Sequence, residues 1–370
     1  MNRRKLTLLW RRLDRFEFGK DVVLIPKLLG RELDCNVDIV CGFDADMEAE
    51  VRAHETASLK FINRPLSTKP RQRIPVNLRY LKEHARDIDI LMCFHFRPET
   101  IINVLTYKRF NPRGKVYIKL DTISGREFDL SRFGFIQRWL RKIIYRKVIR
   151  ITDVISVETT SAKDNILATA KDFDYLAPKL ALVPNPFDED EFRKQGLKVK
   201  TFNEKENIII TVGRLGTHQK NTELLLDAVG SIDLKGWKCC LIGPGTPEIE
   251  EMARKTPGVE MIGVINDKEK LWGWYNKAKV FVLTSRFESY GLVLSEAARF
   301  ADYIISTDVG AAKDIMKDHR GMIIADGDVK GLTDALSRII EGKEDISRIT
   351  PYINENTVFT VSRLLCQQRH

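Results

Sequence analysis

The amino-acid sequence predicts an α/β protein made of two doubly wound domains with parallel sheets. Its 370 residues suffice for two domains of about 150 residues, each large enough to bury its own core. Short apolar runs alternate with stretches of helical periodicity along most of the chain, which is typical of βαβ units. A polar segment without clear periodicity, residues 187–207, interrupts this alternation and predicts the connection between the domains.

The first domain is predicted over residues 1–187, with the segment from about 352 to 370 packing back onto it through a terminal helix. Six apolar runs in this half have the length of buried parallel strands, and helical patterns separate them. The predicted strands cover residues 6–10, 37–41, 88–94, 116–120, 154–157 and 180–183.

The second domain is predicted over residues 188–351. In sheets of this kind, ligands bind outside the carboxyl ends of the strands, so we expect the site in the strand-to-helix loops of a central cleft that the two domains face. The predicted strands cover residues 208–212, 238–242, 259–262, 280–283, 303–306 and 321–324.

Composition excludes several protein classes. Hydrophobic residues make up 43% and charged residues 30% of the chain, which is close to globular averages. Apolar runs stay well short of the roughly 18 residues of a spanning helix, and arginines interrupt the N-terminal stretch too early for a signal-peptide core. These features predict a cytoplasmic protein. The six cysteines are scattered without a CxxC pair, so neither a zinc site nor a disulfide framework is expected.

Basic residues are concentrated in one part of the chain. The formal net charge is +10, and residues 51–150 alone hold 23 basic and 8 acidic side chains, enough to attract a polyanion or an anionic membrane. Within this part, residues 130–150 combine an apolar side with arginines and lysines. Two interpretations stay open: a helix that packs its apolar face on the sheet, or a basic amphipathic helix on the inner face of a membrane. No nucleic-acid-binding motif accompanies the charge, so nucleic acid is not expected as a partner.

The loop after the predicted strand at 208–212 carries two cations at the start of a helix. Gly213 and Gly216 allow the backbone to come close to a ligand, and the same loop carries the cations Arg214 and Lys220. Helix N-termini, arginine and lysine all favour phosphate, so the loop predicts a diphosphate clamp. A tight turn with solvated basic residues is the alternative.

A second loop, after the predicted strand at 280–283, supplies two carboxylates. The string ESYGLVLSE sets Glu288 and Glu296 eight residues apart, the first in the loop and the second two turns into a helix. Along a nucleotide sugar, one carboxylate would accept hydrogen bonds from sugar hydroxyls and the other from ribose hydroxyls. The backbone amides of residues 289–291 would then point at phosphate.

Several segments together resemble the retaining GT-B glycosyltransferases of family 4. The resemblance covers the whole second half, and in the first half it is limited to residues 91–96 and 182–188. The glycine pair usual after the first strand of that family is missing, which leaves Gly19 and Lys20 to approach phosphate or acceptor. The matching segments of the second half are residues 213–220, LIGPGTP at 241–247, SRFESYGLVLSEA at 285–297, ISTDVGAAKDI at 305–315 and GMII at 321–324.

The resemblance implies a metal-independent, retaining glycosyltransferase of GT-B fold. Its donor would be a nucleoside diphosphate sugar, UDP rather than GDP, without a further cofactor, and its acceptor a glycan or lipid-linked glycan in surface polysaccharide biosynthesis. Arg214 and Lys220 would bind the diphosphate, Glu288 would orient the sugar and Glu296 would hold the ribose. The residues implied at the remaining positions are His95 near the sugar as a further catalytic residue, and Gly213, Gly243, Gly245, Val264, Ile265, Ser289, Tyr290 and Gly291 around the donor.

Two other interpretations compete with this one. Asp44-Ala45-Asp46 is a DxD string, which a different glycosyltransferase fold uses to hold a metal and a nucleotide sugar, although such short strings recur by chance. The basic segment would also fit an α/β protein that binds nucleic acid or membrane without any transferase activity.

Overall fold

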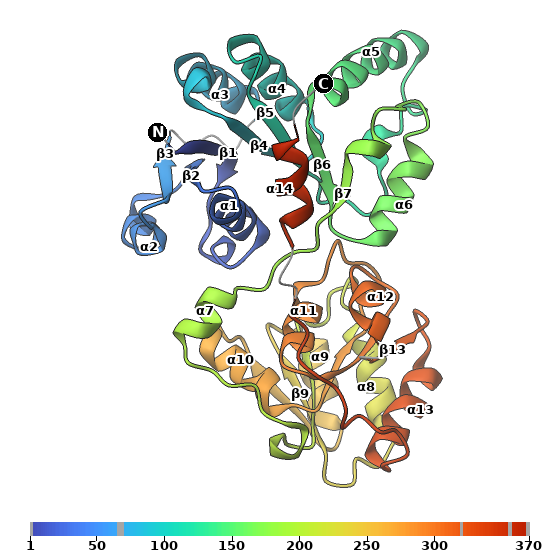
Figure 1. Ribbon diagram of the computed structural model, residues 1–370. Coiled ribbons are helices and arrows are strands. Elements are labelled where there is room, and N and C mark those ends of the chain that lie inside the picture. The colour runs from blue at the N-terminus through green and yellow to red at the C-terminus, as the bar shows by residue number, and fades with distance from the viewer. Residues whose placement is uncertain (1–2, 65–69, 319–320, 354–356, 368–370) are drawn as a thin grey trace. The chain divides into compact units, whose positions relative to one another are not determined.

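The computed structural model describes residues 3–64, 70–318, 321–353 and 357–367 and divides into two compact units (Figure 1). One unit combines Met1–Pro186 with Glu355–His370, and the other spans Phe187–Asn354. Each unit holds one parallel sheet with helices on both faces. The structure thus confirms the predicted pair of doubly wound, Rossmann-like α/β domains.

The first unit contains a seven-stranded sheet in the order β3-β2-β1-β4-β5-β6-β7. All six predicted strands of this half are present. The edge strand β3 was not predicted, because Lys60 and Asn63 interrupt its apolar residues at exposed positions and leave no continuous apolar run. The strands are β1 (Arg4–Arg12), β2 (Cys35–Gly42), β3 (Leu59–Asn63), β4 (Ile90–Phe94), β5 (Lys115–Lys119), β6 (Val154–Val157) and β7 (Leu180–Leu182).

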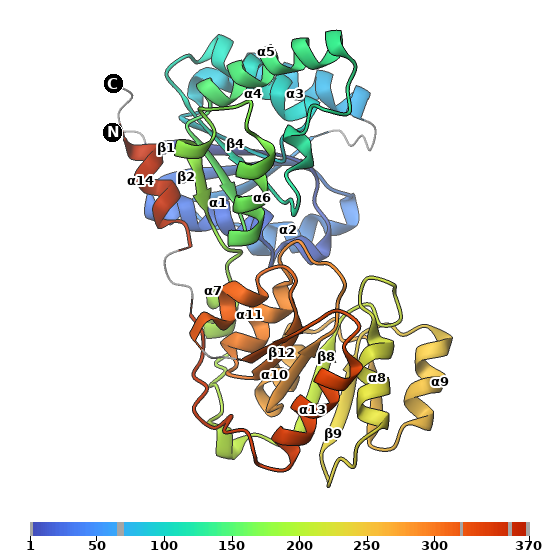
Figure 2. The same cartoon turned by 90° about the vertical axis from the view of Figure 1, so that its right-hand side faces the viewer.

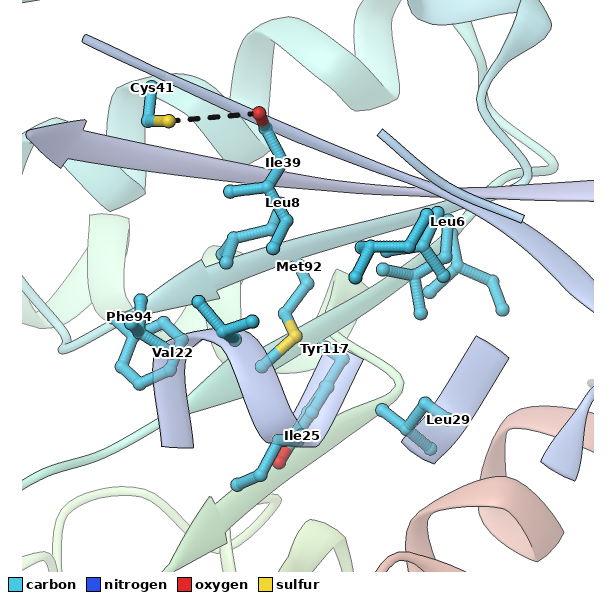
Figure 3. Packing of buried hydrophobic residues seen from close by; sticks show 14 of the residues in the cluster. Leu6, Leu8, Val22, Ile25, Leu29, Ile39, Cys41, Met92, Phe94 and Tyr117 are labelled. Carbon is cyan, nitrogen blue, oxygen red and sulfur yellow. Dashed lines mark hydrogen bonds between the residues drawn. The ribbon is translucent and has the colours of Figure 1, made fainter. Parts of the chain in front are cut away.

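Helices cover both faces of this sheet because its strands are apolar on both sides. Leu6 and Leu8 of β1 point to the face that α1 covers, while Leu9 packs in the core on the opposite face. Figure 3 shows Val22, Ile25 and their neighbours packed against the strands on the first of these faces. The helices are α1 (Asp21–Glu32), α2 (Glu48–His54), α3 (Pro70–His84), α4 (Pro98–Phe110), α5 (Phe135–Ile151), α6 (Thr160–Thr169) and α14 (Phe359–Cys366).

The last helix, α14, belongs to the first unit. It contacts α1, β6 and β7. Val361 and Leu365 on α14 are buried in the same apolar core as Leu6 and Ile25. The chain therefore ends on the domain in which it begins, and apolar burial holds this helix in place.

The burial pattern of helix α5 disagrees with one of the two interpretations of residues 130–150, the one in which its apolar face packs on the sheet. Its buried residues are Tyr145, Val148 and Ile149, all in the C-terminal half. The apolar residues that were expected to pack on the sheet, Ile136 and Leu140 among them, are exposed, because only the C-terminal turns of the helix reach the core. That packing interpretation is wrong for most of the helix. No helix in the described part of the chain is both long and apolar enough to cross a membrane.

The second unit contains a six-stranded parallel sheet in the order β10-β9-β8-β11-β12-β13. All six predicted strands are present, and four of them have the predicted bounds. The apolar runs here are continuous, as expected for strands covered on both faces. The strands are β8 (Ile208–Val212), β9 (Lys238–Ile242), β10 (Val259–Gly263), β11 (Val280–Leu283), β12 (Tyr303–Thr307) and β13 (Gly321–Ile324).

Helices α8, α9 and α13 pack on one face of this sheet, and α7, α10, α11 and α12 on the other. The prediction of a plain connection at 187–207 needs correction, because it contains α7. Phe192 of this helix packs with Trp272 and Phe300, and Arg299 Nε donates a 2.7 Å hydrogen bond to Glu189. The helices are α7 (Glu189–Lys194), α8 (Thr222–Gly230), α9 (Pro247–Lys255), α10 (Lys268–Lys277), α11 (Leu292–Arg299), α12 (Ala312–Ile315) and α13 (Val329–Ile340).

Candidate functional site

Three loops of the second unit meet at the carboxyl ends of the adjacent strands β9, β8 and β11. The loop after β8 is bonded to the loop after β9, because Leu215 N donates to Pro244 O at 2.8 Å. It is also bonded to the loop after β11, since Arg286 N donates to Gln219 O at 2.8 Å. This is the edge at which open α/β sheets bind ligands.

Two glycines predicted for the donor site bring these loops close together. A Cβ on Gly243 would lie 1.9 Å from Gly213 O, and its φ of +130° also favours glycine. A Cβ on Gly213 would lie 2.9 Å from Cε of Lys220, so the lysine side chain passes directly over this glycine. The glycine therefore makes room for the cation.

Lys220 and Glu288, predicted for the same site, form an ion pair. Lys220 Nζ lies 2.6 Å from Glu288 Oε1, and the two side chains are only 13% and 10% exposed. Ser285 Oγ donates to the same carboxylate oxygen at 2.8 Å. The contact with Glu288 uses one of the three N–H donors of the ammonium group, so the pair fixes the position of a cation that retains donor capacity for an anion.

Gln219 connects Arg214 to this pair. The exposed Arg214 donates through Nη2 to Gln219 Oε1 at 2.8 Å. Gln219 Nε2 in turn donates to Phe287 O at 3.0 Å and to Glu288 Oε2 at 3.3 Å. Gln219 and Ser285 were not predicted as site residues. The sequence signals for them were that Gln219 directly precedes Lys220 and that Ser285 lies three residues before Glu288.

The start of α11 lies beside the same loops. Gly291 is the N-cap residue with a φ of +80°, and the hydroxyl of the buried Tyr290 accepts a 3.2 Å hydrogen bond from Ser295 Oγ. Tyr290 O accepts from Ala311 N at 2.8 Å, while Ser289 is exposed. Tyr290 thus belongs to the core of the unit, and its neighbours on either side form the N-terminal end of the helix.

Glu296 lies in the second turn of α11. Tyr275 on α10 donates through its hydroxyl to Glu296 Oε2 at 2.9 Å. Burial raises the pKa of Glu296 above its ordinary value and raises that of Tyr275 well above 10.0. The carboxylate is therefore fixed in orientation by a buried tyrosine, which helical spacing alone did not identify.

The residues predicted around the base lie at the ends of β9 and β10. Val264 is 59% exposed and Ile265 is half-buried directly after β10. Gly245 follows β9, and a Cβ there would lie 2.9 Å from Met261 Cε. Apolar side chains at this edge suit a planar base, and the role of Val264 and Ile265 remains a prediction.

His95 lies in the first unit, at the end of β4, where it adopts a φ of +58°. It lines a cavity of about 250 Å³. Burial, with the nearby Arg97, lowers the pKa of His95 to about 4, so the imidazole is neutral at neutral pH. The cavity is lined by Leu9, Trp10, Arg11, Arg73, Ile74, Cys93, Phe94, His95, Arg97, Pro98, Glu99, Thr100 and Asn103.

Helices α3 and α4 supply further polar groups to this cavity. Arg73 pairs with Glu99 at 3.1 Å, and Asn77 Nδ2 donates to the same carboxylate at 2.9 Å. Asn103 is buried, and its Oδ1 has no hydrogen-bond partner among the residues that the structure describes. Gly19 stands apart from this lining, in the turn before α1.

A buried charge network at the same edge of the first sheet was not predicted. Lys119 at the end of β5 is fully buried, lies 2.6 Å from Asp21 of α1 and also pairs with Glu158 after β6. Asn185 Nδ2 donates to Glu158 Oε1 at 3.0 Å. Burial raises the pKa of Glu158 to about 7. Of these residues, only Asn185 lies in a segment that the sequence singled out, residues 182–188.

The two aspartates of the DxD string engage different arginines. Asp44 pairs with Arg12, and Asp46 lies 3.4 Å from Arg15. In residues 3–64, 70–318, 321–353 and 357–367, no three His, Cys, Asp or Glu side chains cluster as metal ligands would. The string therefore acts here as part of a surface ion-pair arrangement.

Comparison with known proteins agrees with this geometry. Residues 192–356 match the family of glycosyl transferases group 1. This group 1 region contains all three loops described above. The chain is 35% identical over 121 residues to the amylovoran biosynthesis glycosyltransferase AmsD of Erwinia amylovora, covering 32% of this chain and 34% of that protein.

Two further similarities extend the comparison. The lipopolysaccharide core biosynthesis mannosyltransferase LpsB of Rhizobium meliloti is 26% identical over 171 residues, covering 43% of this chain and 47% of LpsB. The matched segments thus span about a third to a half of these relatives. The structure of the lipopolysaccharide outer core galactosyltransferase WaaB has a TM-score of 0.66 at 16% identity, over 96% of this chain and 99% of that one, which shows the GT-B fold. The group 1 match and these relatives support a glycosyltransferase.

Proposed function

We propose that the protein is a retaining glycosyltransferase that transfers a sugar from a nucleoside diphosphate donor to a hydroxyl of a glycan or glycolipid. The observation that carries this proposal is the Lys220–Glu288 pair with Arg214 beside it, at the carboxyl edge of the sheet in the group 1 region. The relatives named for amylovoran and lipopolysaccharide core biosynthesis favour surface polysaccharide assembly as its setting.

The two cations would act on the leaving group. As the bond between the anomeric carbon and the diphosphate oxygen breaks, negative charge develops on the diphosphate, and Arg214 and Lys220 donate to it. The acceptor oxygen forms the new bond to the same face of the carbon, and its proton passes to the departing diphosphate. No protein nucleophile and no metal take part in this scheme.

The carboxylates would hold the donor at its two ends. Glu296, fixed by Tyr275, would accept hydrogen bonds from the ribose hydroxyls. Glu288 would orient the transferred sugar, with Ser289 and Gly291 supplying backbone at the start of α11. Val264 and Ile265 would lie against the base, for which we favour uracil over guanine.

The acceptor would bind in the cavity of the first unit that His95 lines. Its volume of about 250 Å³ is slightly below the range of about 300–1,000 Å³ for drug-sized ligands, which suits one sugar unit. Arg73 supplies hydrogen-bond donors and Asn103 an acceptor oxygen for its hydroxyls. Gly19 and Lys20, which lie outside this lining, would approach the donor phosphate or the acceptor.

The test is Arg214→Ala against the matched control Arg338→Ala, an exposed arginine on α13. Transfer and donor hydrolysis are measured with a panel of UDP and GDP sugars, and NMR follows the anomeric configuration of the product. We expect Arg214→Ala to lower turnover by about 100-fold or more, since one lost donor to developing charge has this effect. Both variants should melt like the wild type, because exposed side chains contribute little stability. Wild-type turnover of Arg214→Ala would remove it from the clamp, and inertness toward every donor in the panel would refute the function.

A further inference from the structure

Helix α5 presents an unpartnered apolar surface to solvent. Phe135, Ile136 and Trp139 are 85%, 71% and 57% exposed. Figures 1 and 2 both show α5 at the periphery of the first unit. We call this surface the α5 apolar stripe; its members are Phe135, Ile136, Trp139, Leu140, Ile143 and Ile144.

The stripe is opposite the face by which α5 is attached to the domain. An α-helix turns by about 100° per residue, so Tyr145, Val148 and Ile149 fall on one side of α5. The six residues of the stripe then span roughly the other half of the helix circumference. The core-facing side alone satisfies the fold, and the stripe contributes nothing to that core.

The charged residues of α5 itself are all cations. Residues 130–150 contain seven arginines and lysines and no acidic residue. Six of the seven cations also have contacts within the domain. Lys142 lies 2.5 Å and Arg138 3.8 Å from Asp172, and Arg146 donates to the backbone oxygen of Asp172. Arg150 donates to Tyr175, and Arg132 and Arg141 lie over the ring of Phe133. Lys147 is exposed at the C-terminal end of the stripe. An apolar half-cylinder on a helix whose own charged residues are all cations is complementary to a surface with an acyl interior and anionic headgroups.

We propose that α5 docks the protein on an anionic lipid bilayer, with the stripe inserted at the boundary between headgroups and acyl chains. Large exposed apolar patches mark interaction sites, and the seven cations disfavour a second copy of the same face because like charges would meet. The helix lies in the plane of the interface and does not span it. This proposal is independent of the transferase activity.

The main experiment is flotation of the full chain with neutral phosphatidylcholine vesicles and with vesicles that also contain phosphatidylglycerol. We expect binding to the anionic vesicles that weakens with added salt. The combined variant Phe135→Ser, Ile136→Ser, Trp139→Ser should lower this binding by about 100-fold or more, because each side chain loses its transfer into an apolar medium. The control Phe359→Ser removes a comparably exposed ring from α14 and should bind like the wild type.

Two further measurements distinguish a loss of lipid binding from misfolding of the triple variant. Lys147→Glu replaces one exposed side chain, and reversing its charge should weaken anionic binding by about tenfold or more. The emission of Trp139 should shift to the blue on anionic vesicles, and Trp139→Phe should lack this shift while it still binds. Arg214→Ala should bind vesicles normally, so a failure of the proposed transfer chemistry remains separate from a failure of docking.

Defined results would overturn the proposal. One is absence of wild-type binding to anionic vesicles, and another is equal binding by the triple variant. Sedimentation that shows a wild-type dimer and a monomeric triple variant, without vesicle binding, would assign the stripe to self-association. A gel shift with RNA near physiological salt that the triple variant loses, again without vesicle binding, would assign it to nucleic acid.

Discussion

Replacing Lys220 with methionine tests the ion pair at the centre of the site. Methionine keeps most of the aliphatic stem that passes over Gly213 and removes only the ammonium group. Glu288, 10% exposed, then retains its hydrogen bonds from Ser285 and Gln219 but loses its cation. We therefore expect a loss of stability and a loss of turnover that have separate causes.

The size of the stability loss follows from the burial of the pair. Removing one partner of a buried pair costs about 3–5 kcal/mol, because the other charge is left without compensation. Since Lys220 and Glu288 keep slight exposure and Glu288 keeps two hydrogen bonds, we expect about 2–3 kcal/mol. For a unit of the size of residues 187–354, this corresponds to a fall in Tm of roughly 4–12 °C.

The assay is a double-mutant cycle by thermal unfolding. Lys220→Met, Glu288→Gln and the double variant are compared with Lys238→Met, which breaks an exposed pair with Glu260 and should cost less than about 1 kcal/mol. The double variant should be more stable than the sum of the single effects predicts. Strict additivity, or a Lys220→Met variant that melts like the wild type, would refute the pair. Turnover is measured well below the lowered Tm, so that unfolding does not contribute.

The remaining predictions concern titratable groups. Calorimetry should show that the affinity for a nucleoside diphosphate falls as the pH drops through the raised pKa of Glu296, because the protonated carboxyl accepts hydrogen bonds from ribose less well. The Glu296→Gln variant should bind weakly and lack this pH dependence. Identical pH profiles for the wild type and the variant would contradict the role of Glu296. His95 should titrate by NMR near pH 4. Its lowered pKa gives stability that is present above about 6.5 and lost toward pH 4, and His95→Gln should remove that part of the acid destabilisation. A midpoint near 6.5 would show that His95 is solvated.

Most strands could be predicted because a strand that is buried on both faces is a continuous run of apolar residues. The strands β8, β9, β11 and β13 are covered on both faces, so nearly every residue in them is apolar and their ends are sharp. At the sheet edge β3 lacks this signal. Helical periodicity in α5 was also correct, but periodicity cannot tell an apolar face that meets a sheet from one that meets another partner.

Side-chain partnerships of the site could be predicted less well than its residues. Lys220 and Glu288 were both identified, yet they stand 68 positions apart, and only the register of β8 beside β11 brings their loops together. The same holds for Lys119 and Glu158, which lie 39 positions apart at the ends of the adjacent strands β5 and β6. Local patterns name the residue types at strand ends, and sheet order decides which of them pair.

The two faces of α5 connect the proposed lipid surface to the proposed acceptor cavity within one domain. Tyr145, on the core side of α5, packs against Phe96 with ring centroids 4.9 Å apart. Phe96 directly follows His95, and α4, whose first turn lines the cavity, contacts α5. Because domain cores are close-packed, a bilayer bound to the opposite side of α5 would stand at a fixed distance from that cavity. A lipid-linked acceptor would then need to lift only its glycan from the headgroup region to reach His95, which explains why an apolar stripe on this helix is compatible with a hydrophilic reaction.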